Sequence, residues 1–366
     1  HSVGAFLKAN SADGDTAARV DDQSFSLIHE AAADIEILEQ EIAELTKGAD
    51  PDGKGIEVET ATVDASDNTI SEEEMAKGLM YTLNHFREAT GQGLSLKNLK
   101  ENLGSLAREG AERVQNFRRI VAAGAFDPAF HPIIHLKSGR IHYYEALVRF
   151  HGKSQDASPF REITFAAESD LIHEFDIMMA KKVITWLSQK PRISNAYNVA
   201  VNVSGNSINN DQFLDQLDIL LKENDWAQGK LSFEITESAH MSDLDSANNF
   251  IQRLRKAGYQ VCLDDFGAGF ASFQYLSSLD VDIVKLDGSA VKNAEKSKKG
   301  RAFLSALTEL CRRLGVETVG GTIDTPETLA FVRDCNVDFV QGFLFGKPSG
   351  DLKDFDPLPH RELMSW

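Results

Sequence analysis

Cysteine and long apolar runs are scarce in this chain. It has three cysteines, Cys262, Cys311 and Cys335, an odd number with no Cys-x-x-Cys pair. This usage excludes a disulfide framework and a zinc ribbon, and it is typical of a reducing cytoplasm. No segment approaches the roughly 20 apolar residues of a membrane span, and the first residues lack a signal-peptide pattern. We therefore expect a cytoplasmic chain without a membrane span. Since it opens at His1 without Met, we expect a fragment, which an upstream anchor could precede.

Positive charge is also in short supply. The 38 Lys and Arg residues face 56 Asp and Glu residues, a formal net charge of −18 at pH 7. Such a field repels nucleic acid and anionic lipid, so DNA binding is not expected. An anionic ligand would need local help from a metal ion or a few placed cations. The 366 residues, at about 150 per domain, predict two domains with ample length for a core in each.

The first part of the chain, residues 1–93, alternates strand and helix patterns. Strands are predicted from Phe25 to His29 and from Gly55 to Val63, and helices from Ala33 to Leu45 and from Glu72 to Arg87. Ser71 and Glu74 form a capping-box pattern at the last helix. These signals predict a small α/β unit. Apolar residues at helical spacing from Leu96 to Val121 predict a long helix, which we assign to a connector over residues 94–124.

From residue 125 to 356, short apolar runs alternate with helical segments, which is the pattern of a repeated β/α unit. The predicted strands are Pro132 to Leu136, Ile141 to Phe150, Tyr197 to Val203, Leu231 to Ile235, Gln260 to Leu263, Asp282 to Leu286, Glu317 to Gly320 and Asp338 to Phe343. The first two are separated only by a hairpin loop, residues 137–140, so one strand must run antiparallel. We predict a TIM-like (β/α)8 barrel with one reversed strand, followed by a tail over 357–366.

Polar side chains stand at the ends of successive predicted strands. They are Glu145, Asn202, Glu234, the pair Asp264 and Asp265, Lys285 and Gln341. A single acid at a strand end is usually a solvated rim residue or a salt-bridge partner. Carboxylates converging on one barrel mouth would instead repel one another unless a hard cation lies among them. Oxygen ligands favour Mg²⁺, Mn²⁺ or Ca²⁺, and we expect Lys285, inside an apolar run, to pair with the acids.

These residues also carry a family resemblance. The segment Glu145-Ala146-Leu147-Val148-Arg149 resembles the signature of the EAL domain, the phosphodiesterase and receptor domain for cyclic di-GMP. Further segments resemble that family in order, over about residues 112 to 356. They are Val201 to Ser204, Phe233 to Ser238, Leu263 to Phe270, Val284 to Asp287 and Gln341 to Gly346.

The resemblance implies a role for each of these positions. Glu145, Asn202, Glu234 and Asp264 would hold a first Mg²⁺ or Mn²⁺, and Asp265 would help to hold a second. Lys285 would touch the attacking water. The ligand contacts implied are Leu147, Arg149 and Ser204, with the last two at the phosphates, together with Phe270 and Gln341. The reaction implied is two-metal hydrolysis of one phosphodiester bond to give the linear dinucleotide.

One segment departs from the family pattern. After Val319, active members usually continue Ala-Glu-Gly-Val-Glu-Thr, whereas this chain has Gly320-Gly321-Thr322-Ile323-Asp324-Thr325. The first family glutamate, implicated in the second metal site, is replaced by Gly321, and the second by the shorter Asp324. Since glycine offers no oxygen, turnover should fall by several powers of ten, on the scale of about 10²–10⁴ for a general base alone.

Two points stay open at this level. Asp324, or Glu317 from another register, could replace the missing ligand. His131 stands where the family usually has Gln before Pro-Ile, and it is either a hydrogen-bonding substitute or a satisfied core residue. Cys262, inside an apolar run, is expected in the core rather than as a nucleophile.

The N-terminal unit has a weaker resemblance to the GGDEF domain, the cyclase that makes cyclic di-GMP. The segment from Val20 to Phe25 lies where that family carries its Gly-Gly-Asp-Glu-Phe hairpin, and only Phe25 matches. The first strand and helix of that domain are missing, and so is the inhibitory Arg-x-x-Asp. The resemblance therefore implies a partial, degenerate unit without cyclase activity, and an unrelated α/β unit is the alternative.

Three classes of function fit these observations. The first is a receptor that binds cyclic di-GMP through a degenerate EAL domain, as a homodimer that signals to a downstream protein. The second is a slow Mg²⁺- or Mn²⁺-dependent phosphodiesterase. The third is a protein-interaction scaffold that binds no nucleotide, and the intact acid cluster argues against it. Gly321 favours the receptor over the enzyme.

Overall fold

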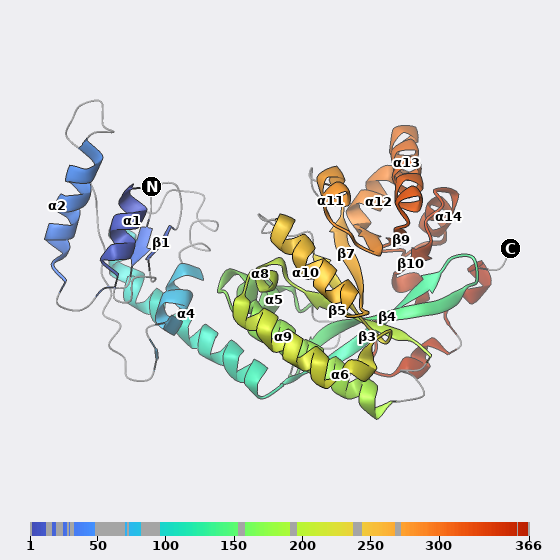
Figure 1. The fold of residues 1–366 in the computed structure, drawn as a ribbon, viewed down its shortest axis with the longest axis horizontal. Coiled ribbons are helices and arrows are strands. Elements are labelled where there is room, and N and C mark those ends of the chain that lie inside the picture. The colour runs from blue at the N-terminus through green and yellow to red at the C-terminus, as the bar shows by residue number, and fades with distance from the viewer. Residues whose placement is uncertain are drawn as a thin grey trace. The chain divides into compact units, whose positions relative to one another are not determined.

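The protein divides into two compact units, residues 1–119 and 120–366. A computed structural model describes residues 2–11, 17–19, 25–27, 29, 33–47, 70–71, 73–81, 96–152, 158–190, 196–236, 244–267, 272–356 and 358–364. Figure 1 shows the strands and helices of each unit. Among the described helices, none combines the length and the apolar character that crossing a membrane requires.

The first unit contains a short antiparallel sheet and several helices. Strands β1 (Ala17–Arg19) and β2 (Phe25–Leu27) pair with each other, and α1 (Ser2–Ala9) was not predicted. Helix α2 (Ile35–Thr46) and the long α4 (Leu96–Ala122) confirm two predicted helices. Most of the segment compared with the GGDEF hairpin, residues 20–24, and the predicted strand from Gly55 to Val63 lie outside the described residues.

The predicted capping box is present at the start of helical residues 73–81. The Ser71 backbone N–H donates to Glu74 Oε2 at 3.0 Å, and the Glu74 N–H donates to Ser71 Oγ at 3.2 Å. This reciprocal pairing satisfies two backbone donors that a helix start leaves unpaired.

Helical residues 73–81 lie directly against α4. Gly78 and Gly110 face each other so closely that a Cβ built on Gly78 would lie 2.2 Å from the backbone N of Ala111. Met75, Ala107 and Ala111 bury the adjoining apolar surface. The small residues thus allow backbone-to-backbone contact between two helices.

The second unit is the predicted closed barrel, in the order β10-β3-β4-β5-β6-β7-β8-β9. Its strands are β3 (Phe126–His135), β4 (Arg140–Phe150), β5 (Asn198–Val203), β6 (Leu231–Thr236), β7 (Gln260–Phe266), β8 (Ile283–Leu286), β9 (Glu317–Gly320) and β10 (Phe339–Val340). All eight predicted strands are found. Strand β3 runs antiparallel to both β4 and β10 and is the predicted reversed strand; the other neighbours pair in parallel.

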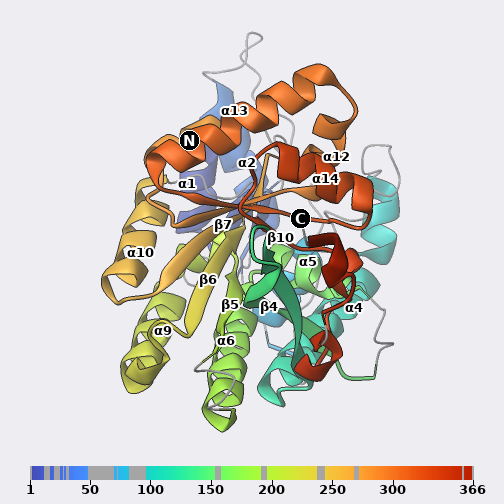
Figure 2. The same cartoon turned by 90° about the vertical axis from the view of Figure 1, so that its right-hand side faces the viewer.

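Helices follow most barrel strands and lie on the outside of the sheet (Figure 2). They are α5 (Phe160–Glu168), α6 (Ile172–Gln189), α8 (Gly205–Ile208), α9 (Asp211–Glu223), α10 (Leu244–Lys256), α11 (Ser272–Ser278), α12 (Gly288–Glu295), α13 (Lys298–Leu314) and α14 (Pro326–Asp334). Short 3-10 turns add η2 (Asp225–Ala227), η3 (Phe343–Phe345), η4 (Leu352–Phe355) and η5 (Arg361–Met364).

The predicted start of the first barrel strand was wrong, because β3 begins at Phe126 rather than at Pro132. The strand pairs with β4 from Phe126 opposite Phe150 onward. Strand β10 pairs only with Ile134 and His135 of β3, and an isolated bridge joins Phe130 to Ser349. The second edge of β3 is thus only partly paired, and proline, which lacks an N–H, is tolerated there.

The predicted last strand was too long, because β10 ends at Val340. A Cβ at Gly342 would lie 2.0 Å from the carbonyl O of Ile323, so the chain leaves the sheet by a close backbone approach that only glycine permits. Gln341 consequently lies just beyond the strand, although its N–H still donates to Gly320 O at 2.9 Å.

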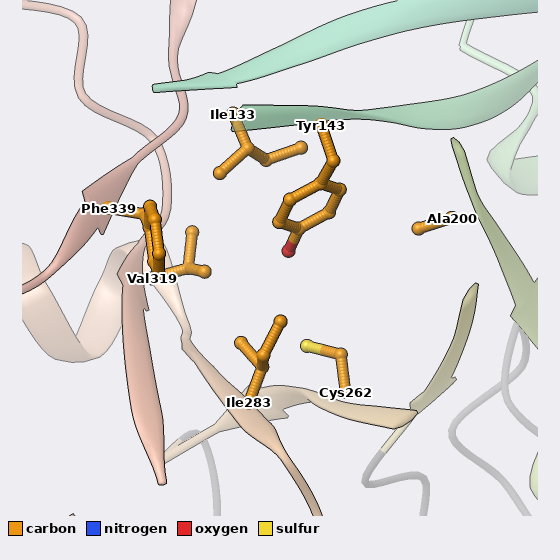
Figure 3. Packing of buried hydrophobic residues seen from close by; sticks show 7 residues of the cluster. All are labelled: Ile133, Tyr143, Ala200, Cys262, Ile283, Val319 and Phe339. Carbon is orange, nitrogen blue, oxygen red and sulfur yellow. The ribbon is translucent and has the colours of Figure 1, made fainter. Parts of the chain in front are cut away.

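Apolar side chains fill part of the barrel interior. Seven of the eight strands each contribute one residue to a buried cluster: Ile133, Tyr143, Ala200, Cys262, Ile283, Val319 and Phe339 (Figure 3). Burial raises the pKa of the Cys262 thiol well above its usual range, which keeps it un-ionised. Cys262 is therefore a core residue, as predicted. The polar residues at the carboxyl ends of the strands therefore lie next to a packed apolar layer.

We expect Gly78→Ala to lower the free energy of unfolding of the first unit by about 1–3 kcal/mol, since the added methyl overpacks a backbone contact. Gly4→Ala in α1 is the matched control. Its Cβ meets nothing within 4 Å, so better helix propensity should stabilise the protein slightly. Urea unfolding of the two variants checks this, and equal stability for both would contradict the described packing.

Candidate functional site

The predicted strand-end residues converge at one end of the barrel. Glu145 comes from β4, Asn202 from β5, Glu234 from β6 and Asp264 from β7, and Lys285 reaches them from β8. Parallel pairing from β4 to β9 places the carboxyl ends of these strands at the same rim. Glu145, Glu234 and Lys285 are nonetheless buried, so this polar group is shielded from bulk water.

Lys285 lies among three carboxylates. Its Nζ is 2.8 Å from Glu145 Oε2, 3.0 Å from Glu234 Oε2 and 3.2 Å from Asp264 Oδ2. A buried ammonium without partners would be costly, and these three hydrogen bonds compensate it. The predicted pairing of Lys285 with the acids is confirmed.

Two amides complete the surroundings of Glu145. Asn202 Nδ2 donates to Glu145 Oε1 at 2.9 Å, and Gln341 Nε2 donates to Glu145 Oε2 at 2.7 Å. Burial alone would raise the pKa of Glu145, but the Lys285 ammonium and the hydrogen bonds outweigh it and hold that pKa at about 2. Glu145 is thus the firmly ionised member of the cluster.

The other two acids have pKa values shifted the opposite way. Burial raises the pKa of Glu234 to about 8, and it raises the pKa of Asp264 to about 6, although Lys285 opposes both shifts. One ammonium cannot neutralise three buried carboxylates, and the remaining repulsion favours protonation of Glu234 and Asp264.

The cluster has the donor set for a hard divalent cation. Ligand oxygens of Glu145, Glu234 and Asp264 all lie within 4.8 Å of one another. Glu234 Oε1 is completely buried and has no hydrogen-bond partner among the described residues, so a bound cation would satisfy it. The carboxylate and amide oxygens here suit Mg²⁺, Mn²⁺ or Ca²⁺ rather than zinc.

The two consecutive aspartates of β7 are separated by an irregularity in the strand. The β7–β8 register shifts between Leu263 and Phe266, and Asp265 has a φ of 57°. Asp265 is exposed, whereas Asp264 is buried, and the Asp265 N–H donates to Asp264 Oδ1 at 2.8 Å. The bulge therefore turns Asp264 into the cluster and leaves Asp265 at the rim.

The signature residues after Glu145 follow it along one face of β4. Leu147 and Arg149 are both half-buried. They lie two and four residues after Glu145, so in a strand all three side chains point to the same face. Arg149 Nη1 donates to the carbonyl of Val148 at 2.8 Å. Phe270 lies outside the described residues.

Ser204, the other predicted phosphate contact, stands directly after β5. It caps α8, and its Oγ accepts the N–H of Asn206 at 3.3 Å. Its own N–H donates to Asp176 Oδ2 at 2.8 Å. Sequence reasoning missed Asp176, although an acid flanked by buried Phe175 and Ile177 in an apolar helix is itself a signal.

The segment after β9 has an unusual backbone conformation. Thr322 has a φ of 57°, a conformation that glycine adopts freely and a β-branched residue adopts at a cost. The resemblance described above places Thr322 where the family usually has glycine, and Gly321 where it usually has glutamate. A Cβ at Gly321 would lie 2.9 Å from the carbonyl O of Leu286, so this backbone has settled around glycine.

Neither residue considered as a replacement for the missing glutamate points to the cluster. Asp324 Oδ1 accepts the N–H of Phe343 at 3.1 Å, and its Oδ2 lies 3.6 Å from Lys292 Nζ. Glu317 begins β9, at the opposite end of the barrel, since β9 runs parallel to β8. The alternative register for Glu317 was wrong.

His131 is a satisfied buried residue that also faces the site. It pairs with Glu145 in the β3–β4 register, and its Nε2 lies 3.1 Å from Gly346 O. Burial lowers the pKa of His131 to about 4, so the ring is neutral at physiological pH. The interpretation of His131 as a satisfied core residue is confirmed, and its role as a hydrogen-bonding substitute for the family glutamine stays a prediction.

Comparison with known proteins agrees with this geometry. The EAL domain model matches residues 114–348, more than half of the 366 residues. The chain belongs to the EAL domain family. Cyclic di-GMP phosphodiesterase PdeB of Shewanella oneidensis is 31% identical over 191 residues, which are 52% of this chain and 22% of PdeB.

Two further matches extend the comparison of this EAL chain. Cyclic di-GMP phosphodiesterase NbdA of Pseudomonas aeruginosa is 28% identical over 244 residues, 66% of this chain and 31% of NbdA. The chain thus spans less than a third of the length of either relative. The FimX EAL domain of Xanthomonas citri, solved with cyclic di-GMP, has a TM-score of 0.59 at 22% identity and matches 66% of this chain and 94% of that one. This likeness supports the fold.

We expect Lys285→Met to lower the free energy of unfolding by about 3–5 kcal/mol at pH 7, since it leaves buried carboxylates without their cation. Lys292→Met is the matched control, because Lys292 is half exposed and pairs only loosely with Asp324. It should change stability by less than about 1 kcal/mol. Urea titration measures both, and a stable Lys285→Met protein would refute the compensating role of the ammonium.

Proposed function

We propose that this EAL chain is a cyclic di-GMP receptor whose capacity for hydrolysis is reduced. The observation that carries the proposal is the contrast between two parts of one rim. The cluster around Glu145 is assembled and shielded, whereas Gly321 offers no oxygen where active relatives have glutamate.

One cation fits the acidic cluster. Glu145, Asn202, Glu234 and Asp264 would hold Mg²⁺ or Mn²⁺, with Ca²⁺ as a non-catalytic substitute, and Lys285 would have to yield part of its place among the carboxylates. When bound, such an ion supplies positive charge that neutralises a phosphate oxygen.

Recognition of the nucleotide rests on the side chains around that cluster. Arg149 would pair with a phosphate through its guanidinium, and Ser204 would donate its hydroxyl to the same group. Leu147, Phe270 and Gln341 would complete the ligand surface. This local set is needed because the overall charge of −18 repels an anion.

Hydrolysis requires more than this set. Asp265 is the acid that we propose for a second cation at this rim, while the carboxylate of Asp324 is paired with Phe343 and Lys292. With Asp265 but without the glutamate that active members have at position 321, the second cation should bind poorly. Since Lys285 and Asp265 are both present, slow hydrolysis to the linear dinucleotide is the second candidate function.

The remaining expectations concern assembly, signalling and location. We propose that the EAL unit works as a homodimer and signals to a downstream protein, with residues 94–124 as the connector. The preceding unit would be a degenerate GGDEF-like module without cyclase activity. Its location would be cytoplasmic.

We expect the purified chain with Mg²⁺ to bind cyclic di-GMP and to release little or no linear product. Isothermal titration measures the binding, and chromatography of the same mixture measures the product. Glu145→Ala and Arg149→Ala should each abolish binding, while Glu317→Gln at the other barrel end should leave it unchanged. Product at an ordinary enzymatic rate would refute the receptor, and absence of binding would leave the scaffold.

We expect the triple variant Gly321→Glu, Thr322→Gly, Asp324→Glu to hydrolyse cyclic di-GMP at least tenfold faster than the parent. The middle change is needed because a side chain at 321 must displace backbone near Leu286, and glycine at 322 relaxes the loop. Gly321→Glu alone should gain less.

Thr322→Gly alone is the control for this experiment. It should leave turnover unchanged and stabilise the fold by about 1 kcal/mol, because it removes a β-branched residue from the left-handed region. A triple variant that folds and binds nucleotide without faster product release would show that the missing glutamate does not limit turnover.

A further inference from the structure

A second buried carboxylate lies behind the rim. Asp176 of α6 is 4% exposed, and its neighbours Phe175 and Ile177 are buried apolar residues. Its Oδ2 accepts two hydrogen bonds, from the Ser204 backbone N–H at 2.8 Å and from Ser207 Oγ at 2.7 Å. An acid in such a place is costly, so its partners must account for it.

These partners belong to one short segment. Ser204 and Ser207 open and line α8, the turn that follows β5. The same segment is tied to α5 by Asn206, whose Nδ2 donates to Ala167 O at 3.1 Å. The turn is therefore anchored to two helices by buried and partly buried hydrogen bonds.

The anchored segment carries site residues at its start. Ser204 is the expected phosphate contact, and Asn202, two residues earlier, donates to Glu145. Because Asp176 accepts a hydrogen bond from the Ser204 backbone N–H, it fixes the position of the main chain there. This constraint does not depend on the orientation of the Ser204 hydroxyl.

We propose that Asp176 is a positioning residue, which holds the turn after β5 so that Ser204 and Asn202 face the ligand. This inference rests on the proposed nucleotide binding. Asp176 touches neither cation ligand nor nucleotide, and it acts through Ser204. Burial raises the pKa of Asp176 to about 7, and that cost is consistent with retention for a purpose other than stability.

Three variants distinguish the hydrogen bonds of Asp176 from simple packing of its side chain. Asp176→Asn keeps an oxygen that can accept both bonds, whereas Asp176→Leu keeps the branching at Cγ, is larger, and accepts none. Ser207→Ala removes the side-chain bond and leaves the bond to the Ser204 backbone. All are tested in the full chain.

The first readout is exchange of the Ser204 amide hydrogen, which needs no nucleotide. We expect protection in the wild type, in Asp176→Asn and in Ser207→Ala, and at least tenfold faster exchange in Asp176→Leu. An unprotected Ser204 amide in the wild type would overturn the anchor, even if Asp176→Leu failed to fold.

The second readout is the Kd for cyclic di-GMP with Mg²⁺. We expect at least tenfold weaker binding by Asp176→Leu and a change within about threefold for Asp176→Asn and Ser207→Ala. A folded Asp176→Leu protein that binds as well as the wild type would refute the positioning role. Wild-type protein that binds no nucleotide would refute the proposed function instead and leave the exchange result standing.

Discussion

The pairing of the Lys285 ammonium with three carboxylates is the interaction on which this end of the barrel depends. Glu145, Glu234 and Asp264 come from three separate strands, and the closed barrel forces them within a few ångströms of one another. Without a cation, their mutual repulsion and their burial would both oppose folding. The three hydrogen bonds of Lys285 supply that charge from within the chain. The rim can therefore stay assembled while its shape remains that of a cation site.

Small departures from regular strand geometry set the roles of adjacent residues. Asp264 and Asp265 are neighbours in sequence, and a regular strand would simply send them to opposite faces. The bulge in β7 places one in the buried cluster and the other at the exposed rim. At the reversed strand, the prolines of β3 are accepted because β10 covers only its last residues.

The segment after β9 has a backbone and a set of contacts that are matched to Gly321. Gly321 lies against the Leu286 carbonyl, Thr322 adopts a glycine-like conformation, and Asp324 is bound to Phe343 and Lys292. These contacts form a self-consistent loop, in which the Asp324 carboxylate is already paired. In the proposed receptor, nucleotide binding would depend on β4 and β5, whereas turnover would depend on the segment after β9.

The sequence by itself determined the barrel, its reversed strand and the identity of the rim acids. Apolar periodicity, the four-residue hairpin after the first strand and polar residues at strand ends are local signals, and they are legible in one chain. Only the tertiary structure decided which of those acids share an ammonium, because that depends on distances between strands far apart in sequence. It also decided that Glu317 lies at the wrong end and that Asp176 holds Ser204, since direction along a closed barrel and contact across a helix leave no trace in residue spacing.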